Sequence, residues 1–176
     1  MIHSIRTPRF LVLTLLVLAA AATRALPLLV PHIWNFTAVG ALAIFAGAQF
    51  NDRRLAFIMP LAAMAISDLF IGNGFIPTVY IGFIAMVVCG VLISKRKSVA
   101  NLFLSSICGA IIFYLITNFA LLYPATLYPH NLSGIIASYV AGLPFLNNML
   151  ASNLIYGTVL FGAFYLLEKR YPSLAK

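Results

Sequence analysis

Charged residues are scarce in this sequence. Of its 176 residues only 8% are charged, whereas 63% are hydrophobic and the mean hydropathy is +1.05. A soluble domain carries about a quarter charged residues, so this chain has too few of them to cover a water-facing surface. The composition excludes a soluble protein and predicts an integral membrane protein, with the lipid bilayer as its first partner.

Cysteines are few, and catalytic motifs are absent. Cys89 and Cys108 both lie in apolar segments, which excludes a disulfide framework and a CxxC metal pair and predicts buried structural thiols. There is no HExxH, GxSxG or Walker A motif, so no catalytic or metal-binding residue is assigned. The net charge of +8 comes from short clusters rather than from a basic face alternating with aromatic residues, and nucleic acid is therefore not an expected partner.

Acidic residues are the rarest charged type, with three in the chain. Asp68 is the only one between Asp52 and Glu168, and it lies within the hydrophobic run Leu55–Ile71. A carboxylate inside a membrane costs a few kcal/mol unless it faces protein, water or a ligand, and such residues are by default functional. Two interpretations stay open: Asp68 belongs to a functional site, or it lies near a helix end and caps it.

Six apolar segments are long enough, or nearly so, to cross a bilayer, which takes about 20 residues of helix. They are residues 10–26, 36–50, 55–71, 78–94, 100–122 and 145–167. The expected fold is an all-α, six-transmembrane-helix bundle, with residues 1–176 forming a single integral membrane domain. Residues 135–143 are expected to form a separate short helix at the interface or against the bundle. The first segment resembles a signal peptide; we expect a retained helix, and cleavage after its alanines is the alternative.

The distribution of Lys and Arg predicts the orientation. With the N-terminus inside, ten of the eleven Lys and Arg residues fall on the inner side and only Arg24 on the outer side, in line with the positive-inside rule. The inner cations are Arg6, Arg9, Arg53, Arg54, Lys95, Arg96, Lys97, Lys169, Arg170 and Lys176. Both termini are thus predicted to be cytoplasmic. Glu168, beside Lys169 and Arg170, is expected to belong to a solvated charge cluster.

Unusual polar residues gather at the outer ends of the predicted helices, whereas the inner half is almost purely apolar. This asymmetry predicts a cavity open to the outside, where Asp68 accepts hydrogen bonds from a ligand or holds a neighbouring side chain in place. The predicted ligand-binding residues are Arg24, His32, Asn35, Asp68, Tyr80, Asn118 and Asn148. Asn35 or Thr37 is expected to cap the second helix. Ala43 and Gly47 on that helix form a small-xxx-small pair, which indicates close packing inside the chain or against a partner.

The order of several segments resembles a known group of proteins. The segments are NFTAVGALAIFAGAQF, LAFIMPLAAMAISDLFIG, VYIGF, ITNFA and LPFLNNMLASNLIYG. They resemble small uncharacterised bacterial membrane proteins with the pattern NFTPVGA, SDLxLG, LITNF and PFxxNxLxxxLxY, over residues 35–156. Those proteins are similar to the substrate-binding S-components of energy-coupling-factor (ECF) vitamin transporters, nearest the solitary vitamin B12 transporters.

The resemblance implies six helices, an outward-facing pocket, the bacterial cytoplasmic (inner) membrane, and small-residue helix faces that dock an energising module. Ala21 and Ala25 have such a spacing on the first helix. The B12 relatives use a cysteine in the helix after the Asp-bearing one as a cobalt ligand. Cys89 lies in that helix, but about three turns below Pro77, deeper than an outer pocket needs. A corrinoid is therefore one candidate ligand among others.

The expected function is binding and uptake of a small molecule, a vitamin or cofactor precursor, across the cytoplasmic membrane. Because no ATP-binding motif is present, uptake against a gradient would need a separate energising module; otherwise the protein acts alone as a facilitator. Two alternatives stay open. One is an intramembrane enzyme that uses Asp68 as acid or base, and the other is a structural subunit of a membrane complex whose polar residues bind only neighbouring helices.

Overall fold

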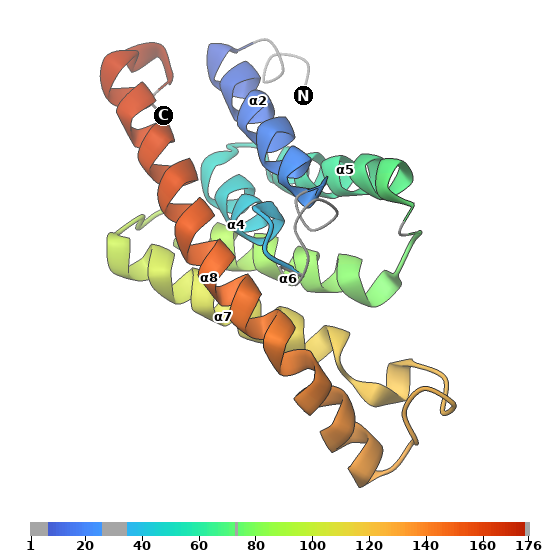
Figure 1. Cartoon of the computed structure of the whole chain (residues 1–176). Coiled ribbons are helices and arrows are strands. Elements are labelled where there is room, and N and C mark those ends of the chain that lie inside the picture. The colour runs from blue at the N-terminus through green and yellow to red at the C-terminus, as the bar shows by residue number, and fades with distance from the viewer. Residues whose placement is uncertain (1–6, 26–34, 73, 175–176) are drawn as a thin grey trace.

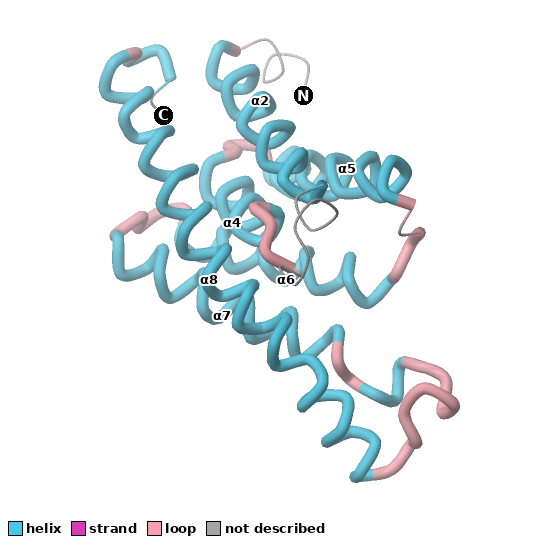
Figure 2. The backbone as a smooth tube through the Cα atoms, viewed as in Figure 1, coloured by secondary structure: helices cyan, strands magenta, loops and turns pink. Residues whose placement is uncertain are grey.

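The structure, a computed structural model, describes residues 7–25, 35–72 and 74–174. Within these residues all regular secondary structure is helical (Figures 1 and 2). The six α-helices are α2 (Pro8–Ala22), α4 (Val39–Gln49), α5 (Arg53–Ile71), α6 (Pro77–Ile93), α7 (Val99–Thr117) and α8 (Leu132–Arg170). Short 3₁₀ turns follow three of them: η1 (Thr23–Ala25), η2 (Ala120–Leu122) and η3 (Pro172–Leu174). The prediction of an all-α fold with six main helices is confirmed for this part of the chain.

Local sequence signals explain where most helices begin. Four helices start after a side chain that accepts a hydrogen bond from a backbone N–H of the first turn, as an N-cap does; these caps are Thr7, Asp52, Ser98 and Asn131. Pro8 and Pro77 stand in the first turns of α2 and α6, where a missing N–H costs nothing. Gly72 ends α5 with φ of 78°, a left-handed conformation that favours glycine.

Helix α4 lies at the centre of the molecule. Every residue of α4 is buried, and the helix contacts α2, α5, α6, α7 and α8. A methyl group at Gly47 would collide with the Val87 carbonyl, and one at Gly90 would collide with the Ile44 carbonyl, so glycine is required for the close approach of α4 and α6. The small-xxx-small pair Ala43 and Gly47 is therefore used inside the chain, and the alternative of a partner interface is wrong.

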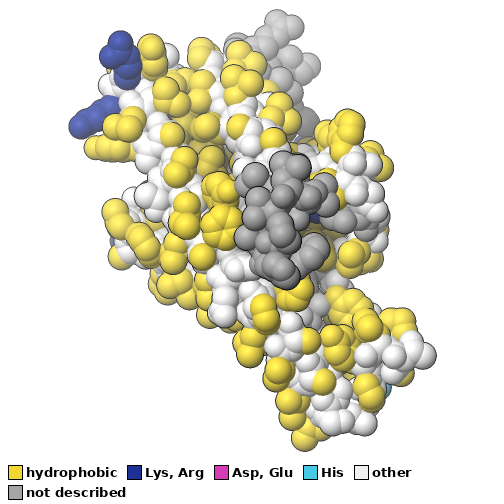
Figure 3. Space-filling model, viewed as in Figure 1, with side chains coloured by type: hydrophobic (Ala, Val, Ile, Leu, Met, Phe, Trp, Pro, Cys, Tyr) yellow, Lys and Arg dark blue, Asp and Glu magenta, His cyan; other side chains and the backbone are white. Residues whose placement is uncertain are grey.

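The molecule has the surface of a membrane protein. Three helices, α5, α7 and α8, are long and apolar enough to cross a membrane, whereas α2, α4 and α6 are shorter apolar helices. Large apolar side chains project outward, for example Leu69 at 85% exposure and Phe70 at 87%, and apolar side chains cover much of the face in Figure 3. Exposure on this scale is compatible with lipid and unfavourable in water.

Helix α8 corrects the prediction for residues 135–143. These residues are not a separate short helix: α8 is continuous over 39 residues and passes through Pro144, and its N-terminal part projects beyond the other helices (Figure 1). A proline inside a helix normally breaks a backbone bond. Here the segment before it is fixed to the end of α7, because Ser138 Oγ donates to the Asn118 carbonyl at 2.6 Å and Tyr114 OH donates to the Tyr139 carbonyl at 2.7 Å.

The helices alternate in direction and define two ends. Contacts bring the starts of α2 and α7 to the ends of α4 and α8, and α5 starts a few residues after α4 ends; we call this the basic end. The exposed cations here are Arg53, Arg54, Lys95, Arg96, Lys97, Lys169 and Arg170. Among the described Lys and Arg residues, only Arg24 lies at the opposite end, where α2 and α5 end and α6 starts.

Candidate functional site

Three of the predicted residues meet at the opposite end. Asp68, in the last turn of α5, is 7% exposed. Its Oδ1 accepts a hydrogen bond from Arg24 Nη2 at 2.6 Å, and its Oδ2 accepts one from Tyr80 OH at 2.8 Å. Arg24 comes from η1 and Tyr80 from the first turn of α6, so one carboxylate joins three elements. We call Arg24, Asp68 and Tyr80 the Asp68 cluster.

The arginine of this cluster is held from a second side. Arg24 Nη1 donates to the Met64 carbonyl at 3.0 Å and to Ser67 Oγ at 2.8 Å. The four-residue spacing of Met64 and Asp68 places both on one face of α5, so the guanidinium lies along that face. The side chains of Arg24 and Asp68 are only 14% and 8% exposed. A buried pair of this kind needs both partners, because removing one leaves an uncompensated charge.

The contacts of Asp68 bear on its two interpretations, a functional site or a helix cap. The side chain binds Arg24 and Tyr80 rather than a helix terminus, and α5 is closed by Gly72, so simple capping is wrong. All three acidic residues are described, and the other two lie elsewhere: Asp52 caps the start of α5, and Glu168 lies at the basic end. Asp68 therefore has no carboxylate partner for acid–base chemistry, and each of its oxygens already accepts a hydrogen bond.

An aromatic pair borders the Asp68 cluster. The ring of Phe75 lies 4.5 Å from the ring of Tyr80, measured between centroids, with an interplanar angle of 46°. Phe75 is 70% exposed, whereas the Tyr80 hydroxyl is bound to Asp68. The cluster thus reaches the surface of the described molecule through an aromatic side chain that a ligand could contact.

Asn35 and Asn118 both line a small cavity that is separate from the Asp68 cluster. This cavity holds about 10 Å³, and its wall is Asn35, Phe113, Tyr114, Thr117, Asn118, Phe145, Leu146 and Met149. That volume suits about one water molecule, and its wall includes no residue of the Asp68 cluster. Asn118 is engaged in ending α7, since its Nδ2 donates to the Tyr114 carbonyl at 3.0 Å. Asn148, half-buried, precedes Met149 in α8; His32 lies outside the described residues.

The predicted cap of α4 is wrong. Neither Asn35 nor Thr37 caps this helix: its N-cap is Ala38, which has no capping side chain. Thr23 Oγ1 instead accepts the Ala38 N–H at 2.8 Å. Asn35 has φ of 62°, a left-handed turn conformation that asparagine tolerates better than most residues. A threonine 15 residues earlier in the sequence could not be identified by local spacing.

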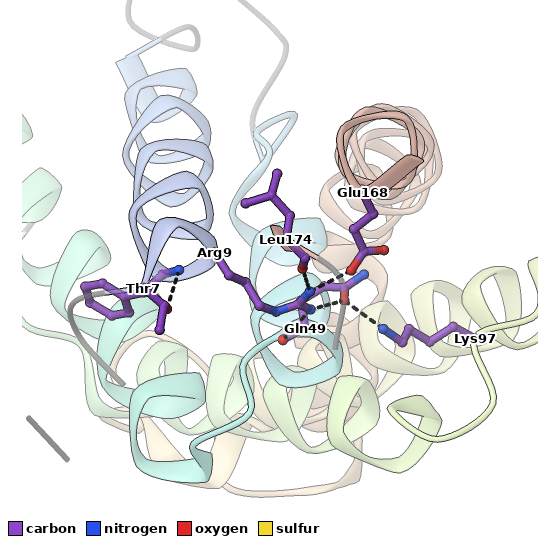
Figure 4. A network of polar contacts seen from close by, with 7 residues as sticks. Thr7, Arg9, Gln49, Lys97, Glu168 and Leu174 are labelled. Carbon is purple, nitrogen blue, oxygen red and sulfur yellow. Dashed lines mark hydrogen bonds and ion pairs between the residues drawn. The ribbon is translucent and has the colours of Figure 1, made fainter. Parts of the chain in front are cut away.

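The basic end contains a second buried arginine that sequence reasoning counted only as an orientation signal. Arg9 is 6% exposed, and its Nη1 donates to Glu168 Oε1 at 2.6 Å and to the Leu174 carbonyl (Figure 4). Its Nη2 donates to the Gln49 carbonyl at 3.1 Å and to Gln49 Oε1 at 3.2 Å. Lys97 Nζ donates to the same Oε1 at 2.7 Å. Glu168 therefore pairs with Arg9 and is not part of a solvated cluster with its neighbours in sequence.

A larger cavity lies beside Arg9, between α7 and α8. It holds about 480 Å³, within the range of roughly 300–1,000 Å³ typical of small-molecule sites. Its wall is Gln49, Lys97, Val99, Leu102, Phe103, Ser106, Leu154, Gly157, Thr158, Phe161, Gly162, Tyr165 and Glu168. We call it the α7–α8 groove. The sequence predicts a cavity at the outer end and not this one, because Gly157 and Gly162 are only two of the four glycines in α8.

The cysteines do not fit a cobalt site. Cys89 and Cys108 are free thiols, and Cys89 is only 8% exposed. Among the described residues no group of three His, Cys, Asp or Glu could hold a metal. Because Cys89 is packed against the core, it cannot reach a cobalt ion in an outer pocket, and the corrinoid candidate loses its ligand.

Comparison with known proteins gives one match. A family model described as "Family of unknown function (DUF6580)" matches residues 4–174. No curated protein and no solved structure gives a significant match.

Proposed function

The chain belongs to this family of unknown function, and we propose that it binds a small molecule at the opposite end and takes part in its uptake across the bacterial cytoplasmic membrane. The proposed substrate is a vitamin or cofactor precursor, as in the S-components that the sequence resembles. The observation that carries the proposal is the Asp68 cluster, in which η1, α5 and α6 contribute charged and hydroxyl groups to one place next to an exposed aromatic ring.

The proposed topology has six spans with both termini in the cytoplasm. Its support is the gathering of nearly all described cations at one end of alternating helices, because cytoplasmic loops are enriched in Lys and Arg. Helix α4 has only 11 residues and would cover about half of the roughly 30 Å hydrocarbon core. Since the other five helices enclose α4, its ends can lie at membrane depth without exposing backbone to lipid.

In this proposal Asp68 acts as a positioning residue. Its two oxygens fix the guanidinium of Arg24 and the hydroxyl of Tyr80, and these two groups with the Phe75 ring form the surface offered to the ligand. An arginine donates up to five hydrogen bonds, and a ligand carrying a carboxylate or carbonyl would use the donors that remain. A planar ligand would stack on Phe75.

The energy source is part of the proposal. Uptake proceeds through a separate ECF-type energising module, or the protein acts alone as a facilitator. The Ala21–Ala25 spacing is weak support for docking on α2, because Ala21 packs in the core at 8% exposure. The outward face of α2 instead has larger side chains, Leu11, Leu15 and Leu18.

A ligand-retention experiment tests the proposal. The full chain is purified in a mild non-ionic detergent, and co-purifying small molecules are identified by mass spectrometry. We expect one compound in near-stoichiometric amount with the wild type, loss of it in Asp68→Asn, and retention in Glu168→Gln. The second variant is a matched control, because it alters the acid of a buried pair at the other end. Retention by both variants would place the ligand away from the Asp68 cluster.

The second candidate is a structural subunit, which the satisfied hydrogen bonds of Asp68 favour. Both oxygens have donors from the chain itself, as expected for a residue that only fastens helices together. In that case no small molecule co-purifies, cells expressing the protein accumulate no compound, and Asp68→Asn and Glu168→Gln lower only the unfolding temperature.

A further inference from the structure

The α7–α8 groove is lined mainly by apolar side chains of two helices. The α7 wall contributes Val99, Leu102 and Phe103, and the α8 wall contributes Leu154 and Phe161. The proposed function does not use the groove, since none of Arg24, Asp68 and Tyr80 lines it. An apolar channel of about 480 Å³ facing the membrane would be filled by hydrocarbon, because water there finds few polar partners.

Two glycines of α8 create part of this space. A methyl group built on Gly162 would have no atom within 4 Å, and one on Gly157 would meet only Ser106 Oγ at 3.7 Å. Elsewhere, at Gly47 and Gly90, glycine is required because another backbone occupies the space. At Gly162 nothing from the described chain occupies it. Glycine inside a helix is less favourable than alanine, so an open, unfilled glycine face suits a bound molecule.

The groove has a charged end. Gln49, Lys97 and Glu168 line it at the basic end, and Lys169 Nζ lies 5.6 Å from the centroid of the Tyr165 ring, which also lines it. Glu168 is neutralised by Arg9 at 2.6 Å, so Lys97 and Lys169 leave a net positive charge.

The contacts of Lys97 leave it room for an anion. The side chain is exposed overall, and the one hydrogen bond described for its ammonium is to the neutral Gln49 amide. Desolvation nevertheless lowers the pKa of Lys97, the nearby Arg9 cation lowers it further, and the Glu168 carboxylate opposes that shift only in part. An anion at the ammonium would favour its charged form.

We propose that the α7–α8 groove binds one acyl chain of an anionic phospholipid, with the lipid phosphate on Lys97 and Lys169. The apolar walls and the open glycine face accommodate the chain, and the cations at the basic end select the headgroup. This end is the one that the cation distribution assigns to the cytoplasmic leaflet, where anionic lipids attract basic residues. The groove is thus a lipid site built into the α7–α8 pair.

The test compares an anionic and a zwitterionic phospholipid that carry the same acyl chains. The full chain in non-ionic detergent is titrated with phosphatidylglycerol or phosphatidylcholine of identical acyl chains, and bound lipid is counted by native mass spectrometry. We expect phosphatidylglycerol to bind more tightly than phosphatidylcholine. Lys97→Gln should weaken phosphatidylglycerol binding roughly fivefold, and Lys97→Gln/Lys169→Gln roughly 25-fold, since each cation near a membrane contributes about 1 kcal/mol. Phosphatidylcholine, whose phosphate is balanced by its own choline cation, should lose less affinity in both variants.

Variants of the groove floor test the position. Gly162→Leu places a side chain in the open space and should abolish binding of both lipids, whereas Gly162→Ala should retain it. Both variants should fold, because leucine and alanine are better helix formers than glycine; circular dichroism and the unfolding temperature check this. Arg53→Gln removes a cation of the basic end outside the groove wall and should leave the preference for phosphatidylglycerol unchanged.

Three outcomes would overturn the proposal. Equal affinity for the two lipids would show that the groove does not select an anionic headgroup. An effect of Arg53→Gln as large as that of Lys97→Gln would make the preference a property of the whole basic end. Wild-type lipid binding by a folded Gly162→Leu variant would place the lipid elsewhere and leave the groove to a partner helix.

Discussion

The two buried arginine–carboxylate pairs resemble each other in geometry and differ in their surroundings. Arg9–Glu168 and Arg24–Asp68 both have a nitrogen–oxygen distance of 2.6 Å and lie at opposite ends of the bundle. Together they use two of the three acidic residues in the chain. In a protein with so few carboxylates, each pair fixes which helix ends meet, and this is a well-attested use of buried charges.

The two pairs differ in what borders them rather than in burial, since the Glu168 side chain is 24% exposed and lines the α7–α8 groove. The Arg9 guanidinium lies 4.9 Å from the centroid of the Phe164 ring, and Phe164 is fully buried. Arg9 also ties α2 to α4, α8 and η3. The Asp68 cluster instead borders the exposed Phe75 through the Tyr80 ring. We propose that the first pair contributes stability and the second contacts a ligand, and the following variants test that distinction.

The largest effect is expected at Arg9. Arg9→Met removes the cation while Glu168 and the acceptors of Gln49 and Leu174 stay in place, which should lower the free energy of unfolding by about 3–5 kcal/mol. Thermal unfolding in detergent, followed by circular dichroism, measures the loss. Arg170→Met, at an exposed position of the same end, should change it by less than about 0.5 kcal/mol. Equal effects of the two variants would show that the buried pair contributes no more than surface charge.

The next effect distinguishes the charge of the Asp68 cluster from its packing. Asp68→Leu leaves Arg24 buried without its partner and should cost about 3 kcal/mol of unfolding free energy. The double variant Arg24→Met/Asp68→Leu removes both charges and should recover most of that loss, because apolar side chains of similar size often replace a buried pair without cost.

The double variant also tests function. If the Asp68 cluster contacts the ligand, the recovered protein still lacks the co-purified compound. A double variant that is both stable and fully loaded with ligand would contradict the proposed site.

The sequence predicted the helices and the two ends more accurately than the contacts within them. Apolar segments and the distribution of cations follow from residue type alone, so six helices and the placement of Arg24, Asp68 and Tyr80 at one end could be predicted. The charge pattern could not identify Arg9 as buried, because its partner Glu168 is 159 positions away and shares no periodicity with it. Whether the Asp68 cluster binds a ligand stays a prediction.

Two predictions, for residues 135–143 and for the α4 cap, were wrong for another reason. Each was made from neighbouring residues in the sequence, whereas contacts with other helices decide the structure there. Residues 135–143 were expected to form a separate short helix, but hydrogen bonds from Ser138 and to Tyr139 hold this segment in line with the rest of α8. The α4 cap was expected from a nearby side chain, but Thr23 of another element supplies it. The α7–α8 groove was not predicted, because it forms where glycines leave space between two helices. Residue spacing alone does not show which glycines face open space.

The smallest effect is expected at Tyr80, where it separates the aromatic ring from its hydroxyl. Tyr80→Phe removes one hydrogen bond to Asp68 Oδ2 and keeps both the Arg24 pair and the stacking on Phe75. Because a hydrogen bond to a charged group contributes about 1.5–3 kcal/mol and this site is only partly buried, we expect a loss near the lower limit, about 1.5 kcal/mol. The variant Tyr114→Phe is the control for the loss of a tyrosine hydroxyl, because the Tyr114 hydroxyl donates to a neutral carbonyl.

If the ligand uses the Tyr80 hydroxyl, Tyr80→Phe weakens ligand retention and Tyr114→Phe does not. Equal retention by both would restrict the ligand contact to Arg24 and the Phe75 ring.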